Sequence, residues 1–373
     1  MNKIAPYQIL FPIGILNSLL AVGVWLLSVS TTSFITHAIF IHPKLILGGF
    51  LWSFVLGFLM TAVPRMTGTK AASPLELTVA VTLIFIGMIF AFLIDGRWFY
   101  GNLIAITLFL FIYGLKRILY TKKSMPIFFS HIGLGVLLAC AGSYSYFVGD
   151  NLLGFHLLHV GAILLLVLGI GTRFFSFLSG LPSEFEGVSN FKKLLFHFLG
   201  ISVATLLYLA GKSNPWAYLV LSLISLYYIT FVWRIFRKAS RESALKYGVR
   251  VVALVIPLSF ALCWLLPLYY ISWFHILFMG CFSLLTYAVA TRVTLAHGAY
   301  SIDLESQTKS LWAFLICLLL ALFFRVSYGL ALEPLKSQLL NFAILFWFIS
   351  VIIWCYSFLL KIFKRGDQQA PSC

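Results

Sequence analysis

Long apolar runs follow one another along the chain with only short polar loops between them. A run of about 20 apolar residues is the length that an α-helix needs to cross a bilayer, and such runs are too long and too unbroken for barrel strands. The sequence therefore predicts an all-α polytopic membrane protein with about twelve transmembrane helices, in one integral membrane domain over residues 1–373. The runs centre on 9–29, 45–63, 75–94, 98–115, 127–147, 152–178, 194–210, 216–233, 249–270, 273–291, 311–330 and 339–360.

Composition excludes several classes of protein. Apolar residues make up 62% of the chain and charged residues only 10%, whereas soluble domains average about 45–50% and about 25%. A soluble enzyme, a disordered protein and a nucleic-acid binder are thereby excluded, and the lipid bilayer is the expected partner. The formal net charge of +16 is interpreted as loop charge that sets membrane topology, not as a nucleic-acid surface.

The distribution of Lys and Arg predicts the orientation. With the N-terminus placed on the cytoplasmic side, 21 of the 26 basic residues fall in cytoplasmic segments. Cytoplasmic loops of membrane proteins carry such an excess, so both termini are predicted to be cytoplasmic. The other five basic residues fall on the outer side: Lys44, Arg97, Lys212, Arg325 and Lys336.

Histidines mark the outer ends of the second, sixth and tenth runs. These are His42, the pair His156 and His159, and His275. Ionisable groups inside a bilayer are costly and usually face the bundle interior, and neutral imidazole commonly binds haem iron and copper. His156 and His159 are three residues apart and so share one helix face. All four are candidate metal ligands; the alternative is hydrogen bonding between helices or a place at the interface.

A motif recurs in every fourth run. In the sixth and tenth runs a Gly follows the first His by five residues, a Thr by sixteen and an Arg by seventeen. These residues are His156, Gly161, Thr172 and Arg173, and His275, Gly280, Thr291 and Arg292. The second run, from His42 to Arg65, follows this plan less regularly. The pattern predicts three four-helix units in a pseudo-threefold arrangement, with repeats at 1–120, 121–240 and 241–365.

The arginines of this motif are expected at the opposite membrane face from the histidines. Seventeen helical residues rise about 25 Å, which nearly spans a hydrocarbon core of about 30 Å. Arg65, Arg173 and Arg292 could therefore converge at the inner face and hold haem propionates or another anion. The alternative is that they are topology charges only.

Three segments resemble sequence blocks of the NnrS family. Residues 57–68 resemble its GFLLTAVPxWTG block, residues 169–177 its IGGRxxPxFT block, and residues 275–298 its HxLxxGA…TR…LGHTG block, which brings His297 into the candidate metal ligands. Two departures stand out: HxHE at the head of the second run reads His42-Pro43-Lys44-Leu45, and the Trp of the first block is Met66.

The resemblance implies a bacterial inner-membrane protein that carries haem and copper and acts in the response to nitric oxide and nitrosative stress under denitrifying conditions. The plan is also similar to that of haem–copper oxidases, in which helices 2, 6 and 10 carry metal ligands. By that analogy His42 and His275 are the expected axial ligands of a haem b, with Arg65, Arg173 and Arg292 as further haem-binding residues.

Copper is the weaker expectation, because part of the HxHE motif is missing. Nitric oxide or another small diatomic ligand, and a respiratory or denitrification complex, are the expected partners. Two alternatives stay open: a membrane oxidoreductase acting on nitric oxide, and a metal-free transporter or assembly factor for a respiratory complex. The sequence identifies no catalytic residue and does not decide whether the protein is an enzyme.

Overall fold

The computed structural model describes residues 4–28, 32–93, 95–179, 189–237 and 242–364, and within these ranges its regular secondary structure is all helical, without strands. The predicted all-α class is thus confirmed. In chain order the elements are α1 (Pro6–Ser28), α2 (Thr32–Lys44), η1 (Leu45–Leu51), α3 (Trp52–Thr67), α4 (Pro74–Ala91), α5 (Gly96–Leu119), α6 (Phe129–Phe147), α7 (Asn151–Gly154), η2 (Phe155–Ala162), α8 (Ile163–Ser179), α9 (Asn190–Gly211), α10 (Trp216–Tyr227), η3 (Tyr228–Val232), α11 (Ala244–Leu265), η4 (Pro267–Tyr269), α12 (Tyr270–Leu277), η5 (Phe278–Ser283), α13 (Leu284–His297), α14 (Leu304–Gln307), α15 (Ser310–Leu330) and α16 (Leu335–Phe363).

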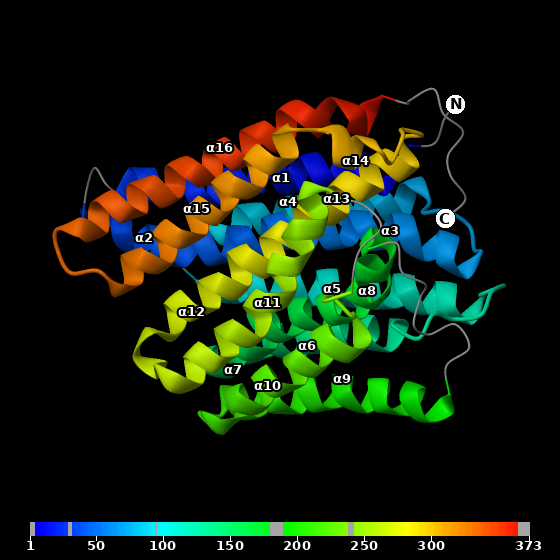
Figure 1. The fold of residues 1–373 in the computed structure, drawn as a ribbon, viewed down its shortest axis with the longest axis horizontal. Helices are drawn as coiled ribbons and strands as arrows, with labels where there is room; N and C mark the ends of the chain where they lie inside the picture. The colour runs from blue at the N-terminus through cyan, green and yellow to red at the C-terminus, as the bar shows by residue number, and fades with distance from the viewer. Residues whose placement is uncertain (1–3, 29–31, 94, 180–188, 238–241, 365–373) are drawn as a thin grey trace.

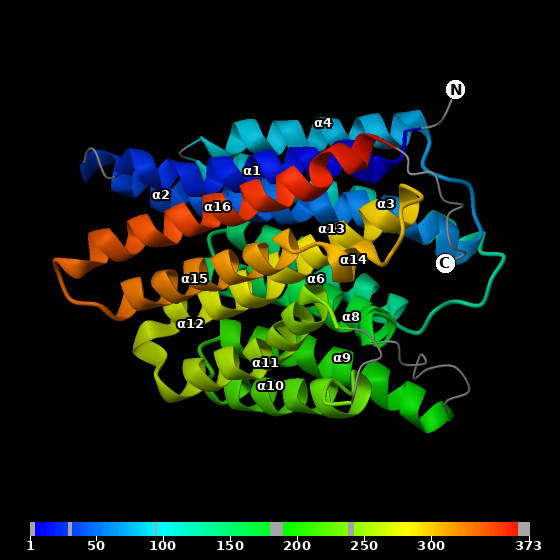
Figure 2. The same ribbon diagram turned by 45° about the horizontal axis from the view of Figure 1, so that its top comes forward.

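The long helices run side by side along one common direction, as both ribbon views show (Figures 1 and 2). The side-chain amide of Gln8 donates to the carbonyl of Ile362 over 2.8 Å. The start of α1 and the end of α16 therefore lie together at one end of the bundle. This agrees with a prediction that puts both termini on the same side of the membrane; which side that is stays a prediction.

Ten helices of the described residues are long and apolar enough to cross a membrane. The multi-pass membrane class is therefore supported by length and composition. Two further predicted runs also overlap helices, but Trp216–Val232 is shorter than the ten and Phe129–Phe147 is not among them. The count of twelve crossings stays a prediction.

The three histidine-bearing spans form the inside of the bundle. In the most apolar window of each, 83% of residues are buried in His37–Thr67, 78% in Asn151–Phe175 and 72% in Pro267–His297, against 22–56% in the other seven. Buried spans are surrounded by other helices, whereas the outer spans face lipid with one side. The second, sixth and tenth predicted runs are therefore the central ones, although the three four-helix units remain a prediction.

Each central span contains a π-helical turn close to its histidine. η1 begins three residues after His42, η2 contains His156 and His159, and η5 begins three residues after His275. A π-helical turn adds a residue to the ordinary helical repeat, re-aims the side chains beside it and is frequent at functional sites. The recurrence of this distortion at the histidines was not predicted from the sequence.

One glycine shows how closely the helices approach at these turns. A Cβ atom on Gly49, within η1, would overlap the Asn17 side chain of α1. Any larger residue would push the central span away from α1. Because α1 also supplies the carbonyl that holds His42, this close contact helps to position the site described next.

Candidate functional site

His42 lies near the end of α2 and faces α1. Its Nδ1 atom is 2.8 Å from the carbonyl oxygen of Ala21, and its ring meets Trp25 edge-on at 5.8 Å between centroids. A carbonyl accepts only, so Nδ1 carries the proton and donates. Nε2 then holds a lone pair, and within the part of the chain that the structure describes it has no hydrogen-bond partner.

His275 on α12 is held in the same way. Its Nδ1 atom donates to the carbonyl of Ile271 over 2.7 Å, and its ring meets Phe278 edge-on at 5.8 Å. Its Nε2 likewise has no hydrogen-bond partner among the described residues. An imidazole fixed through one ring nitrogen with the other left open is the usual state of a metal-ligating histidine.

His42 and His275 come from helices far apart in the sequence, yet they lie near enough that a charge on one ring would act on the other. Both also interact with the charge of Arg325 on α15. The guanidinium of Arg325 lies over the ring of Tyr328, 5.2 Å from its centroid. We call His42 and His275 the histidine pair, and the end of the bundle that holds them the histidine end.

His156 is bonded at both ring nitrogens. Nδ1 is 2.8 Å from the carbonyl oxygen of Leu152, and Nε2 is 2.6 Å from the hydroxyl of Tyr218 on α10. In this arrangement His156 joins the central span to α10. A metal at His156 would have to replace one of these bonds.

His159 packs among aromatic rings. Its Nδ1 is 3.3 Å from the Tyr146 hydroxyl, and its ring stacks on Phe155 at 5.6 Å. Phe155 also contacts Phe278, at 6.0 Å, and Phe278 in turn contacts His275. Aromatic rings therefore lie between His159 and the histidine pair.

The predicted copper site is not visible as a ligand cluster. No group of three or more His, Cys, Asp or Glu that could hold a metal occurs within the described ranges. The histidine pair supplies two imidazoles, one fewer than a copper centre with three protein ligands would need. Copper binding stays a prediction.

The three arginines of the repeated motif have different environments. Arg65 and Arg173 are exposed, whereas Arg292 forms a largely buried ion pair with Glu305 on α14, with 2.6 Å between Nε and Oε1. The two groups are close but not aligned as a hydrogen bond. Figure 2 shows α14 and α3 toward one end of the bundle, and α2 and α12 toward the opposite end. Convergence of the arginines on an anion stays a prediction.

His297 belongs to the same end as Arg65, with whose charge it interacts. Its ring contacts Tyr7 at 5.8 Å, and its buried Nδ1 has no hydrogen-bond partner within the described part of the chain. His297 ends α13, more than twenty residues after His275 along one span. The two histidines therefore cannot share one metal, and any role of His297 is separate from the histidine pair.

A sequence model described as NnrS protein matches residues 4–365 of the chain. The chain belongs to the NnrS family. The three short blocks had indicated this membership, and the match extends it over nearly the whole sequence. A search of curated proteins finds no match.

Sequence reasoning missed two parts of the candidate site. Arg325 was interpreted as an outer loop charge, although it lies five residues inside the end of α15. An ionisable residue within an apolar run is itself a sign of function, and that signal could have identified it. Tyr218, the partner of His156, carried no signal, because aromatic residues fill nearly every span of this chain.

Proposed function

We propose that this NnrS-family protein is a haem-binding membrane protein that senses or handles nitric oxide at the histidine end of the bundle. The observation that carries the proposal is the shared state of His42 and His275. Both rings are fixed through Nδ1, and both leave Nε2 open. Two such imidazoles from separate helices suit the two axial positions of a b-type haem, which needs no covalent attachment site.

The charges around the histidine pair favour the same group. A haem carries two propionates, and their burial requires a cation. Arg325 is the cation whose charge acts on both histidines. We therefore propose Arg325 as the propionate partner in place of Arg292, which Glu305 already engages at the opposite end.

Each residue of the site has a distinct task in this proposal. The Ala21 and Ile271 carbonyls fix the tautomer and ring direction of the two histidines, and such bonds raise the basicity of a ligating imidazole. Trp25 and Phe278 pack against the rings and exclude water. When bound, the haem would supply an iron centre with affinity for nitric oxide, provided that one of the two imidazoles can be displaced. Nitric oxide is a small apolar molecule that can reach such a site through the bilayer.

The deciding experiment is an optical spectrum of the detergent-purified protein, oxidised, dithionite-reduced and treated with nitric oxide, with metal analysis of the same sample. We expect a Soret band, b-type bands on reduction and a shift with nitric oxide. A colourless protein, after expression with ample haem, would overturn the proposal and favour a transporter or an assembly factor. Catalytic loss of nitric oxide with a chemical reductant would instead make the protein an oxidoreductase.

A further inference from the structure

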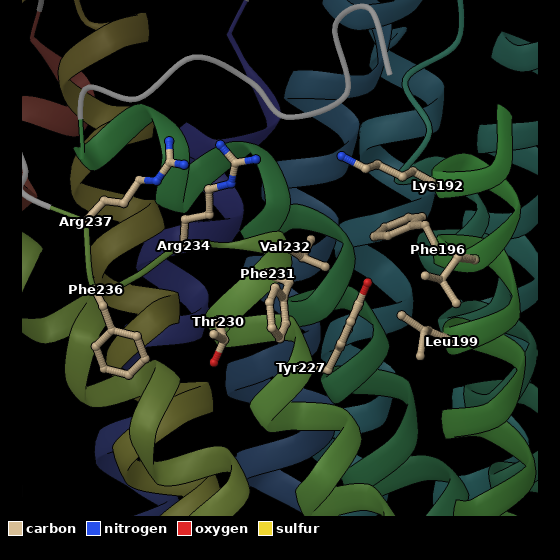
Figure 3. A pocket seen from close by; sticks show the side chains of 11 residues that line it. Lys192, Phe196, Leu199, Tyr227, Thr230, Phe231, Val232, Arg234, Phe236 and Arg237 are labelled. Atoms are coloured by element: carbon tan, nitrogen blue, oxygen red, sulfur yellow. The ribbon is translucent and has the colours of Figure 1, made fainter. Parts of the chain in front are cut away.

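A groove lies between the start of α9 and the end of α10 with η3 (Figure 3). The start of α9 lies at the end of the bundle opposite α12, which carries His275 (Figure 1). The volume of the groove is about 520 Å³, within the range of about 300–1,000 Å³ typical of small-molecule sites. Eleven residues line it: Lys192, Leu195, Phe196, Leu199, Tyr227, Thr230, Phe231, Val232, Arg234, Phe236 and Arg237.

The lining is divided into a cationic rim and an apolar wall. Lys192, Arg234 and Arg237 carry their charged groups toward the same end of the groove, with the lysine on the side opposite the two arginines (Figure 3). None of the eleven lining residues is acidic. Below the rim the wall is made largely of aromatic and aliphatic side chains. The groove therefore suits an amphiphile with an anionic head.

The backbone after η3 fixes the rim. Arg234 adopts a left-handed conformation with φ 51°, which is unfavourable for a non-glycine residue. The amide of Arg237 donates to the carbonyl of Arg234 over 3.0 Å. This turn carries both arginines to the rim, while the preceding Trp233 is buried and stacks on Phe175 at 4.2 Å.

The groove borders the surface that faces lipid. Phe231 and Phe236 belong to its lining and are 62% and 68% exposed, and Leu194 and Phe198 nearby on α9 are 67% and 62% exposed. Exposed side chains of this kind on a membrane-spanning bundle contact acyl chains. A cationic rim directly above them lies where lipid phosphates are found, because basic residues at a membrane interface attract anionic headgroups.

We propose that this groove binds one anionic phospholipid, with its phosphate at Lys192 and Arg237 and an acyl chain along Leu199, Tyr227 and Phe231. The site is separate from the histidine pair and does not depend on haem binding. Charge complementarity selects the headgroup, and the apolar wall distinguishes a lipid from a soluble phosphate compound.

The test uses the purified full-length protein in a neutral detergent and native mass spectrometry. Phosphatidylglycerol and phosphatidylcholine with identical acyl chains are titrated separately. We expect one phosphatidylglycerol to bind at least about tenfold more tightly than phosphatidylcholine, since each interfacial cation contributes about 1 kcal/mol toward an anionic lipid. Equal affinity for the two lipids would overturn the proposal.

Variants assign the binding to the groove. The double variant Lys192→Gln with Arg237→Gln should reduce phosphatidylglycerol affinity to near that of phosphatidylcholine. The matched control, Lys70→Gln with Lys122→Gln, removes two exposed loop charges elsewhere on the protein and should leave the affinity unchanged. An equal loss in both variants would show general charge attraction and contradict the proposed site.

Two further measurements separate the parts of the proposal. Thr230→Trp fills the apolar wall and leaves the cations in place; it should weaken lipid binding, and unchanged binding would contradict the acyl-chain position. Inorganic phosphate at the lipid concentration should not displace phosphatidylglycerol. Displacement would show that the groove binds a soluble phosphate compound and would overturn the lipid assignment.

Discussion

The imidazole of His42 on α2 donates from Nδ1 to the carbonyl oxygen of Ala21 on α1, over 2.8 Å. This contact joins a central span to an outer one and directs Nε2 away from α1. A matching bond to Ile271 fixes His275. The histidine pair is thus held by backbone atoms, which no side-chain substitution removes directly, so the rings themselves are the groups that a substitution can test.

Loss of either ring should abolish haem binding. In His42→Ala or His275→Ala an axial ligand is missing, and the purified protein should lose most of its Soret absorbance per polypeptide. His37→Ala is the matched control, because this exposed residue lies on the same helix and should retain full haem. Undiminished haem in both ligand variants would contradict the axial assignment.

Replacement of Arg325 should make the haem easier to oxidise. A nearby cation disfavours the extra positive charge of ferric iron, so Arg325→Gln should lower the midpoint potential. The expected shift is roughly 60 mV, which is a tenfold change in the equilibrium constant of a one-electron reduction. Redox titration of the Soret band measures this. Arg97→Gln removes an exposed arginine that pairs with Asp95 and should leave the potential unchanged; an equal shift in both would indicate a general surface-charge effect.

Tyr218→Phe should destabilise the fold without loss of haem. The variant leaves Nε2 of buried His156 without its partner at 2.6 Å, and a buried polar group left unsatisfied costs about 1–3 kcal/mol. Unfolding in a denaturing detergent measures the change. Tyr208→Phe, at a side chain 48% exposed, should have little effect. Metal loss together with normal stability would instead assign His156 to a metal site.

The ion pair between Arg292 and Glu305 should serve stability and not haem binding. Glu305→Gln removes the carboxylate beside a largely buried guanidinium and should cost roughly 3–5 kcal/mol. The double variant Arg292→Met with Glu305→Leu should recover most of this loss, because a well-packed apolar pair can replace a buried ion pair. Unfolding free energies test both, and haem loss in the double variant would favour Arg292 as a propionate partner.

The loop contact between Asp150 and Lys212 should depend on pH. The hydrogen bond from the Lys212 ammonium, at 2.7 Å, lowers the pKa of the Asp150 carboxyl below its ordinary value of 3.8. Since the folded-state pKa is the lower one, the stabilisation is present above pH 3.8 and is lost as pH falls through the folded value.

The melting temperature of the Asp150→Asn variant should therefore be slightly lower than that of the parent protein at neutral pH. In strong acid the two melting temperatures should be the same. Thermal scans at several pH values measure the difference. The effect is small because both side chains are exposed to solvent, where an ion pair contributes little. A difference that persists in acid would show that the carboxylate charge is not its cause.

The sequence alone determined the class, the family and the principal candidates. Runs of about 20 apolar residues fix a helical membrane protein, because the bilayer leaves the backbone no other partner for its hydrogen bonds. Position within the apolar runs selected His42, His156, His159 and His275, since ionisable residues recurring at corresponding places in such runs carry a signal that packing residues lack. The analogy with haem–copper oxidases then favoured His42 and His275.

Only the tertiary structure decided how those candidates are held. Which ring nitrogen is open depends on a carbonyl such as that of Ala21, which belongs to a different helix and has no sequence signature. The same holds for Arg325, which helix packing brings to the histidine pair, and for Arg292, which Glu305 engages at the other end. Contacts between helices distant along the chain are set by three-dimensional packing, and periodicity within a single helix cannot reveal them.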